Sequence, residues 1–220
     1  MQKMRVYHFL NKKYGVENII KRHLKIATIM ELNDPFELLG LELSDKKLRR
    51  NIFNIRKYIS KQFGLLCFSK SWTNPVQWSH YADRHKGIVL GFDVPDKYLF
   101  EVEYSSKRLS EEVEKIQSVE KINQNDIKRL LSVKYRHWQY EKEVRWLVRL
   151  NKKSSNGLYY KEFSSDLVLK QVIVGLRSCI SRCEITDALP GNRNDVEVFK
   201  SRSAFKSFRV VRNRNESLWA

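Results

Sequence analysis

The sequence is short of the residues and patterns that mark several common protein classes. Its 220 residues include only 8 glycines and 3 cysteines. The scattered glycines form neither a Walker A phosphate loop nor the glycine fingerprint of dinucleotide-binding folds. The odd number of cysteines, with no pair at zinc-finger spacing, argues against a disulfide scaffold and favours a reducing compartment. No apolar run reaches transmembrane length, and the N-terminal segment is too short and aromatic for a signal peptide. We therefore expect a cytoplasmic protein without a membrane partner.

Motifs for metal and serine chemistry are missing as well. There is no His-Glu-x-x-His sequence and no Gly-x-Ser-x-Gly nucleophile elbow. His80 and His85 lie five residues apart, which is a poor spacing for two ligands on one helical face. No nearby cysteine or histidine completes a zinc site, so we predict no metal site.

Acidic residues are few relative to basic ones. The chain has 42 Lys and Arg against 25 Asp and Glu, a net charge of +17. Such an excess attracts polyanions, of which nucleic acid is the commonest. A phosphate-bearing cofactor and an acidic protein are the alternatives. We expect DNA or RNA to bind through the basic surface; the oligomeric state cannot be inferred.

Short apolar strands are interspersed irregularly with amphipathic helices. Strands are expected at 4–10, 25–32, 64–69, 87–93, 100–104, 138–148, 167–175 and 196–199, with an edge strand in 205–211. Helices are expected at 15–25, at 44–62 with Ser44 as the cap, at 76–85, within 106–134 and at 178–187. Because this order does not fit regular βαβ alternation, we predict an α+β fold with a mixed or antiparallel, split sheet and flanking helices. It is expected to be one domain, 1–220, with a helical insertion around 106–134 and a basic C-terminal tail.

The segment 138–148, Trp-Gln-Tyr-Glu-Lys-Glu-Val-Arg-Trp-Leu-Val, carries the clearest chemical signal. Read as a strand, it places Glu141, Glu143 and Arg145 on one face, with the two carboxylates roughly 7 Å apart. Two carboxylates so placed can act as acid and base or stabilise developing positive charge. The alternative is the ordinary solvated face of an amphipathic strand.

Three other stretches gather polar and aromatic residues. Tyr7 and His8 lie on the first strand, and a lone histidine there is also compatible with a structural role. The Ser-Lys-Ser sequence at 69–71 ends a buried strand, where its hydroxyls could cap the chain or contact a ribose or phosphate. On a helix over 76–85, Trp78, Tyr81 and His85 would share one face, either as part of a site or as core anchors.

Together these stretches resemble a bacterial family named only as domain of unknown function 2971. The matching pieces, in chain order, are Val-Tyr-His-Phe (6–9), Asn-Asp-Pro-Phe-Glu (33–37), Cys-Phe-Ser (67–69), Trp-Ser-His-Tyr-Ala-Asp (78–83), His-Lys-Gly (85–87), Gly-Phe-Asp (91–93), Tyr104, Trp-Gln-Tyr-Glu-Lys-Glu-Val-Arg (138–145) and Val-Ile-Val-Gly (172–175). The ordered set is more specific than any one piece.

The layout is similar to that of ADP-ribosyltransferases, especially the DarT-type enzymes that modify nucleic acid. This resemblance implies NAD as cofactor, with His8 helping to hold it, Glu143 stabilising an oxocarbenium-like transition state and Glu141 orienting the acceptor. The full set of implied catalytic residues is Glu143, Glu141, His8 and Tyr81. The implied cofactor-binding residues are Tyr7, Ser69, Ser71, Trp78, His85 and Arg145. Arg5, Lys70 or Arg84 would meet the diphosphate.

Three functions follow as hypotheses. The first is an NAD-dependent ADP-ribosyltransferase acting on a macromolecular, nucleic-acid target in a toxin or phage-defence role. The second is a non-catalytic, basic nucleic-acid-binding or accessory module of a bacterial defence system. The third is a hydrolase with Glu141 or Glu143 as general base. Convergence of His8, Ser69 and Glu143 on one cleft would favour the first hypothesis.

Overall fold

The structure is a computed structural model that describes residues 2–34, 36, 40–108, 122–189, 191 and 195–219. The described strands are β1 Lys3–Leu10, β2 His23–Thr28, β3 Phe63–Ser69, β4 Ile88–Pro95, β5 Leu99–Glu101, β6 Glu103–Ser105, β7 Val133–Tyr135, β8 Glu143–Arg149, β9 Tyr159–Glu162, β10 Val168–Val174, β11 Glu197–Ser203 and β12 Val210–Arg212. The described α-helices are α1 Lys12–Lys21, α2 Lys46–Gln62, α3 Pro75–Tyr81, α4 Gln124–Leu130 and α5 Arg182–Ala188.

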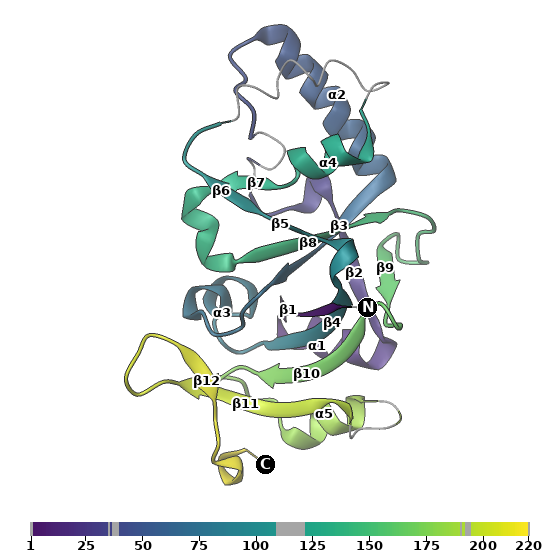
Figure 1. Ribbon diagram of the computed structural model, residues 1–220. Coiled ribbons are helices and arrows are strands. Elements are labelled where there is room, and N and C mark those ends of the chain that lie inside the picture. The colour runs from purple at the N-terminus through teal and green to yellow at the C-terminus, as the bar shows by residue number, and fades with distance from the viewer. Residues whose placement is uncertain are drawn as a thin grey trace.

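Most of these strands form one curled sheet (Figure 1). Its order is β12-β11-β10-β4-β1-β3-β2-β9, while β8 pairs with β3 and β5 pairs with β8. The pairing of β10 with β11 is parallel, and the other pairings in this sheet are antiparallel. A separate pair, β6 and β7, is parallel. The predicted α+β class is confirmed, and the sheet is mixed and mostly antiparallel. Likeness to the ADP-ribosyltransferase fold stays a prediction.

Three apolar clusters hold the helices against the sheet. One centres on Val6, Leu90 and Phe92, which α1 and α5 cover. A second lies between α2, α4 and strand β3 at one end of the molecule (Figure 1). The third surrounds Trp78 of α3. Burying a large apolar side chain contributes about 1.5–3 kcal/mol, so these clusters fix the positions of the strands that carry the site.

Strands β1 and β2 share one edge of β3 and diverge along it. β1 pairs with β3 at Tyr7 and Ser69, whereas β2 pairs with it at Ala27 and Leu65 and at the following register position. These described pairings lie on either side of the segment from Leu66 to Phe68. The divergence opens a space in the sheet next to the first strand.

Several expected boundaries were wrong for local reasons. Helix α1 begins earlier, at the Asn11 cap, and ends at Arg22, which adopts the left-handed conformation (φ 51°). Strand β2 therefore starts at residue 23 and not at 25. Helix α2 is capped by Asp45, whose carboxylate accepts the Leu48 N–H, and not by Ser44.

The helix expected within 106–134 is only partly seen. Residues 109–121 lie outside the described part. Among the described residues, Gln124–Leu130 is helical and Val133–Tyr135 is a strand. The expected strand 100–104 is divided between β5 and β6, which pair with different partners.

The C-terminal region does contribute an edge strand. That strand, β12, is confined to Val210–Arg212. None of the described helices is both long enough and apolar enough to cross a membrane.

Candidate functional site

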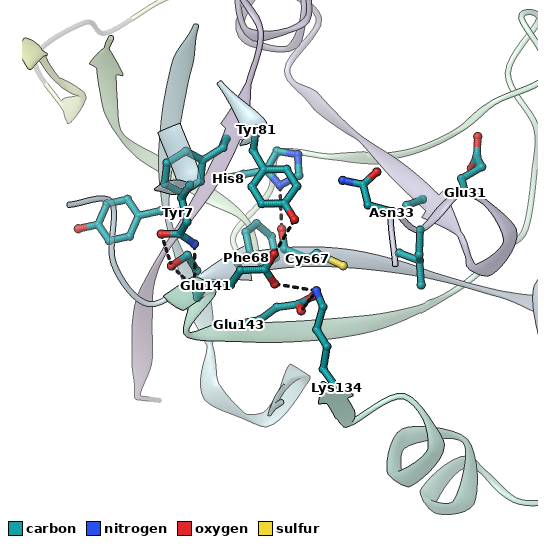
Figure 2. A pocket seen from close by; sticks show the side chains of 15 residues that line it. Tyr7, His8, Glu31, Asn33, Cys67, Phe68, Tyr81, Lys134, Glu141 and Glu143 are labelled. Atoms are coloured by element: carbon teal, nitrogen blue, oxygen red, sulfur yellow. Dashed lines mark hydrogen bonds and ion pairs between the residues drawn. The ribbon is translucent and has the colours of Figure 1, made fainter. Parts of the chain in front are cut away.

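A cavity of about 210 Å³ lies where β1 and β2 diverge (Figure 2). Aromatic rings form much of its wall, and the two carboxylates of the predicted site lie at one end. The lining residues are Tyr7, His8, Phe9, Ala27, Glu31, Leu32, Asn33, Cys67, Phe68, Ser69, Gln77, Tyr81, Lys134, Glu141 and Glu143. His8, Ser69 and Glu143, which lie far apart in the sequence, thus meet at one cleft.

Glu141 and Glu143 converge, but not as neighbours on a strand face. Residues Arg136–Glu141 form a 3₁₀ helix, and Lys142 then takes the left-handed conformation (φ 46°, ψ 48°). Strand β8 begins only at Glu143. The expectation of one continuous strand over 138–148 was therefore wrong. The turn at Lys142 brings the Glu141 carboxylate beside that of Glu143.

The alternative of a solvated polar face was also wrong. Glu141, Glu143 and Arg145 are 5%, 6% and 0% exposed. Glu143 lies over the α2 and α4 side of the sheet, where Arg145 donates from Nε to its Oε1 (2.7 Å) and from Nη2 to its Oε2 (2.9 Å). Arg145 also donates to the Leu131 carbonyl (2.7 Å). Charges this deeply buried require partners.

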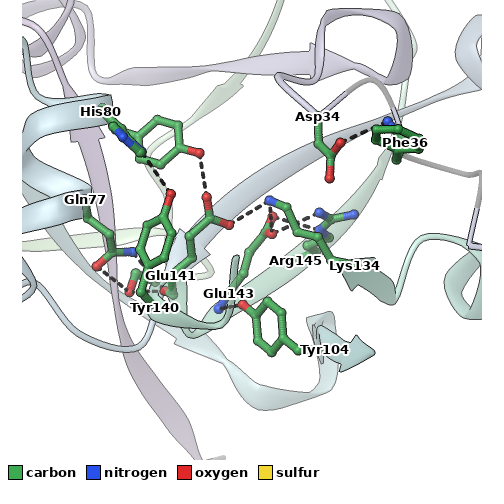
Figure 3. Close-up of polar contacts among 12 residues, drawn as sticks. Asp34, Phe36, Gln77, His80, Tyr104, Lys134, Tyr140, Glu141, Glu143 and Arg145 are labelled. Atoms are coloured by element: carbon green, nitrogen blue, oxygen red, sulfur yellow. Dashed lines mark hydrogen bonds and ion pairs between the residues drawn. The ribbon is translucent and has the colours of Figure 1, made fainter. Parts of the chain in front are cut away.

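Lys134 of β7 bridges the two carboxylates (Figure 3). Its ammonium lies 2.6 Å from Glu141 Oε2 and 3.0 Å from Glu143 Oε2. The other oxygen of Glu141 accepts the Tyr81 hydroxyl (2.5 Å). Two anions and two cations therefore alternate in a chain that runs from Tyr81 to Arg145, and their charges balance.

This row of alternating charges gives the two carboxylates different pKa values. Burial raises the pKa of Glu143, but Arg145 and Lys134 outweigh burial and lower it to about 2. Burial raises the pKa of Glu141 above its usual range, and Lys134 only partly opposes that effect. Burial and the adjacent Glu141 carboxylate also raise the pKa of the Tyr81 hydroxyl. Glu143 is thus a fixed anion, and Glu141 is the carboxylate better suited to exchange a proton.

His8 reaches into the space between β1 and β2. Its Nδ1 lies 2.8 Å from the Cys67 carbonyl oxygen, which can only accept, so Nδ1 donates and Nε2 is left as an acceptor. Burial lowers the pKa of His8, and the hydrogen bond only partly opposes that shift. The imidazole is therefore neutral at pH 7, with an acceptor nitrogen at a cavity wall.

Ser69 and Gln77 hold the backbone of the site. The Ser69 hydroxyl lies 2.6 Å from the Glu141 carbonyl oxygen, and the Gln77 amide donates to the same oxygen (2.9 Å). The Glu143 N–H is bonded to the Tyr104 hydroxyl (2.8 Å), and burial raises the pKa of that hydroxyl to about 12. These contacts fix the turn between the two carboxylates.

Four of the sequence-predicted residues lie outside the cavity lining. Arg145 is buried behind Glu143, and Ser71 bonds to Ser69 and to the Thr73 hydroxyl. Trp78 is fully buried in the core and donates to the Trp72 carbonyl (2.6 Å). His85 stacks on Trp78, because the helix ends at Tyr81 and the chain then turns through three left-handed residues. The interpretation of Trp78 as a core anchor is confirmed.

Two of the three cations expected to meet a diphosphate, Arg5 and Lys70, have other partners. Arg5 pairs with Asp93, and Lys70 with Glu101. A second hollow shares Tyr81 with the cavity, and Lys12 and Lys13 line it. Lys12 pairs with Glu184 (2.9 Å), and the Lys13 ammonium lies 5.7 Å from the centre of the Tyr14 ring.

Sequence reasoning missed Lys134, Gln77, Tyr104 and Asn33. Lys134 was assigned to a polar helix, although its setting between Val133 and Tyr135 has the alternation of a short strand. Tyr104 and Asn33 contribute to the family resemblance but were assigned no role in the site. Among the described residues, no group of three or more His, Cys, Asp or Glu is placed to hold a metal ion.

Comparison with known proteins identifies one family. The model of a family described as protein of unknown function (DUF2971) matches residues 77–146. The matched segment contains Tyr81, Lys134, Glu141, Glu143 and Arg145, so the resemblance to this family is confirmed over the segment that carries the carboxylate site. No curated protein and no solved structure matched the chain.

Proposed function

We propose that this protein of the DUF2971 family is an NAD-dependent ADP-ribosyltransferase that modifies a macromolecular target. One observation carries the proposal: His8, Ser69, Tyr81, Glu141 and Glu143 all line a single cavity in an interruption of the sheet. The five residues come from four separate parts of the chain. The sequence resemblance implies a role in this reaction for each of them.

The cavity suits the nicotinamide end of NAD. Its volume of about 210 Å³ is below the roughly 300–1,000 Å³ of pockets that enclose drug-sized ligands. It can take a ring and its sugar, while the rest of a dinucleotide must lie outside. Tyr7, Phe9 and Phe68 offer ring faces and edges for stacking, and the hollow beside Tyr81 would place Lys12 and Lys13 near the phosphates.

NAD, when bound, supplies an ADP-ribosyl group by cleavage of its bond to nicotinamide. The residues of the chain can meet the charge that this cleavage creates. Glu143 is held ionised by Arg145 and Lys134, and a fixed anion stabilises positive charge developing on a sugar. The neutral His8 offers Nε2 to a hydroxyl.

Glu141 would act on the acceptor. Its raised pKa lets it take a proton from an attacking hydroxyl or amine near neutral pH. Lys134 holds both carboxylates in place. An incoming hydroxyl must compete with Tyr81 and Lys134 for the two carboxylate oxygens of Glu141. Lys134 is therefore a positioning residue in this proposal.

The test is release of nicotinamide and transfer of label from NAD to nucleic acid or protein. We expect the wild type to release nicotinamide, and Glu143→Gln to lower the rate by about 10²–10³, the usual cost of removing one electrostatic contact to a transition state. Glu101→Gln is the matched control, because Glu101 is an exposed carboxylate on β5 paired with Lys70. Circular dichroism should verify that each variant is folded. If the wild type neither releases nicotinamide nor transfers label, the proposal is wrong.

A further inference from the structure

The hairpin formed by β11 and β12 presents two phenylalanines to solvent. At its tip Phe205 is 89% exposed and Phe208 is 99% exposed. The hairpin lies at the end of the molecule opposite α2 (Figure 1). Large apolar side chains that are exposed together are uncommon on a protein surface without a binding role.

The hairpin is strongly basic. From Val198 to Asn215 the sequence has no Asp or Glu. Its cations are Lys200, Arg202, Lys206, Arg209, Arg212 and Arg214. The Arg202 guanidinium lies 4.3 Å from the centre of the Phe205 ring, and Arg209 reaches the Thr73 hydroxyl. Positive charge thus alternates with aromatic rings along the tip.

A hollow of about 580 Å³ separates the tip from the start of α3 and from the turn that follows this helix. Phe205 and Phe208 line one side, while His85, Leu176 and Pro75 line the other. Its described lining contains Lys206 and Arg209 and no carboxylate. Burial lowers the pKa of His85, and Arg177 lowers it further, so its ring is neutral at pH 7. The hollow therefore combines apolar ring surfaces with a cationic rim.

We propose that this hairpin and hollow bind single-stranded nucleic acid. Unpaired bases would stack on Phe205 and Phe208, while Lys206 and Arg209 would meet the backbone phosphates. Rings interleaved with cations are the chemistry by which proteins hold single strands without sequence preference. A duplex keeps its bases stacked and cannot offer them to the two rings. Two protruding rings could insert into a bilayer, but insertion would not require the hollow that the rings also line.

The hairpin is tied to the segment that carries the cleft. The Val210 N–H donates to the Thr73 carbonyl (2.9 Å), and Thr73 lies four residues after Ser69. This inference rests on the proposed function in one respect, because it identifies single-stranded nucleic acid as the class of macromolecule that the transferase would modify. Binding itself needs no NAD, so failure of this inference and failure of the transferase proposal are distinguishable.

The experiment is fluorescence anisotropy with a labelled 20-nucleotide single strand of mixed sequence, without NAD. The Phe205→Ser, Phe208→Ser double variant should bind at least about twenty-fivefold more weakly, since each of two stacked bases contributes about fivefold or more. Lys206→Gln with Arg209→Gln should lower the slope of log affinity against log salt by about 1.4, or about 0.7 per phosphate. The control is Phe53→Ser, because Phe53 is 64% exposed on the basic helix α2; it should leave affinity unchanged.

Several outcomes would overturn the inference. One is a Phe205, Phe208 variant that binds the single strand as the wild type does. Another is a duplex of the same length that binds as tightly as the single strand. A third is the finding that vesicles of phosphatidylglycerol and phosphatidylcholine capture the wild type through the two phenylalanines while single-strand binding does not depend on them. All the substituted side chains are at the surface, so equal thermal unfolding midpoints would verify that the variants are folded.

Discussion

Replacing Glu143 by Gln and replacing Glu141 by Gln should have very different effects on stability. The two residues carry the same carboxylate, are separated by one residue and are similarly buried. Their partners differ. Glu143→Gln removes the anion that faces the fully buried Arg145, whereas after Glu141→Gln the ammonium of Lys134 still pairs with Glu143.

The magnitude follows from the acidity of Glu143. Lowering its pKa from the usual 4.5 to about 2 corresponds to about 3 kcal/mol of stabilisation at neutral pH, since each tenfold change in proton affinity is worth about 1.4 kcal/mol. Breaking a buried ion pair by removing one partner typically costs about 3–5 kcal/mol. Glu141 has a raised pKa, so its ionised form adds no comparable stability. We expect Glu143→Gln to cost about 3 kcal/mol and Glu141→Gln about 1 kcal/mol or less, the contribution of one hydrogen bond.

The assay is equilibrium unfolding in urea at pH 7, repeated at lower pH. Because the folded-state pKa of Glu143 is depressed, its contribution is fully present above pH 4.5 and is lost as the pH falls towards 2. The difference between the wild type and Glu143→Gln should therefore shrink over that interval. Equal costs for the two variants at pH 7, or a larger cost for Glu141→Gln, would refute the ion-pair arrangement.

Two further predictions concern the same cleft. Lys134→Met removes the cation shared by two carboxylates, so the pKa of Glu141 should rise further. Relative to the wild type, the variant should therefore regain stability as the pH falls from 8 to 5. A constant difference in unfolding free energy between variant and wild type over this range would contradict that role. His8 is half-buried, and burial lowers its pKa, so the stability it contributes is present above its usual pKa of 6.5 and is lost as the pH falls below it. His8→Gln should therefore reduce the acid-induced fall in melting temperature between pH 7.5 and 5. An unchanged fall would show that neutral His8 contributes no stability to the fold.

Much of the fold could be predicted from local sequence patterns. β3, β4 and β10 are apolar runs bounded by polar residues, and such runs specify buried strands with little help from the rest of the chain. The amphipathic stripe of α2, with Leu48, Ile52, Ile55 and Ile59, likewise identifies a helix packed on one side. In these segments the local pattern and the tertiary environment agree.

The geometry of the site could not be predicted in the same way. The alternation that puts Glu141, Glu143 and Arg145 on one face predicted a single strand over 138–148. Tertiary contacts instead select a 3₁₀ helix over Arg136–Glu141. Hydrogen bonds from Ser69 and Gln77 to the Glu141 carbonyl hold that turn, and both come from residues more than 60 positions away. Local alternation carries no information about such partners.

Lys134 shows the same limit. Nothing near it in the sequence indicates that β7 will pair in parallel with β6 and direct the lysine toward Glu141 and Glu143. The polar residues of the longer segment 106–134 favoured a helix. The burial of both carboxylates is the physical reason that a cation must lie between them, and that burial becomes evident only in the assembled sheet.

Stabilisation of the protein by NAD tests the central claim most directly. With NAD at a hundredfold excess over its dissociation constant, the free energy of unfolding should rise by about 2.7 kcal/mol, and His8→Gln, which alters the cleft wall, should reduce that gain. The measurement needs no acceptor and no knowledge of the target. An unfolding free energy that does not change with millimolar NAD would contradict the account, and the cleft of His8, Ser69 and Glu143 would then serve a different ligand.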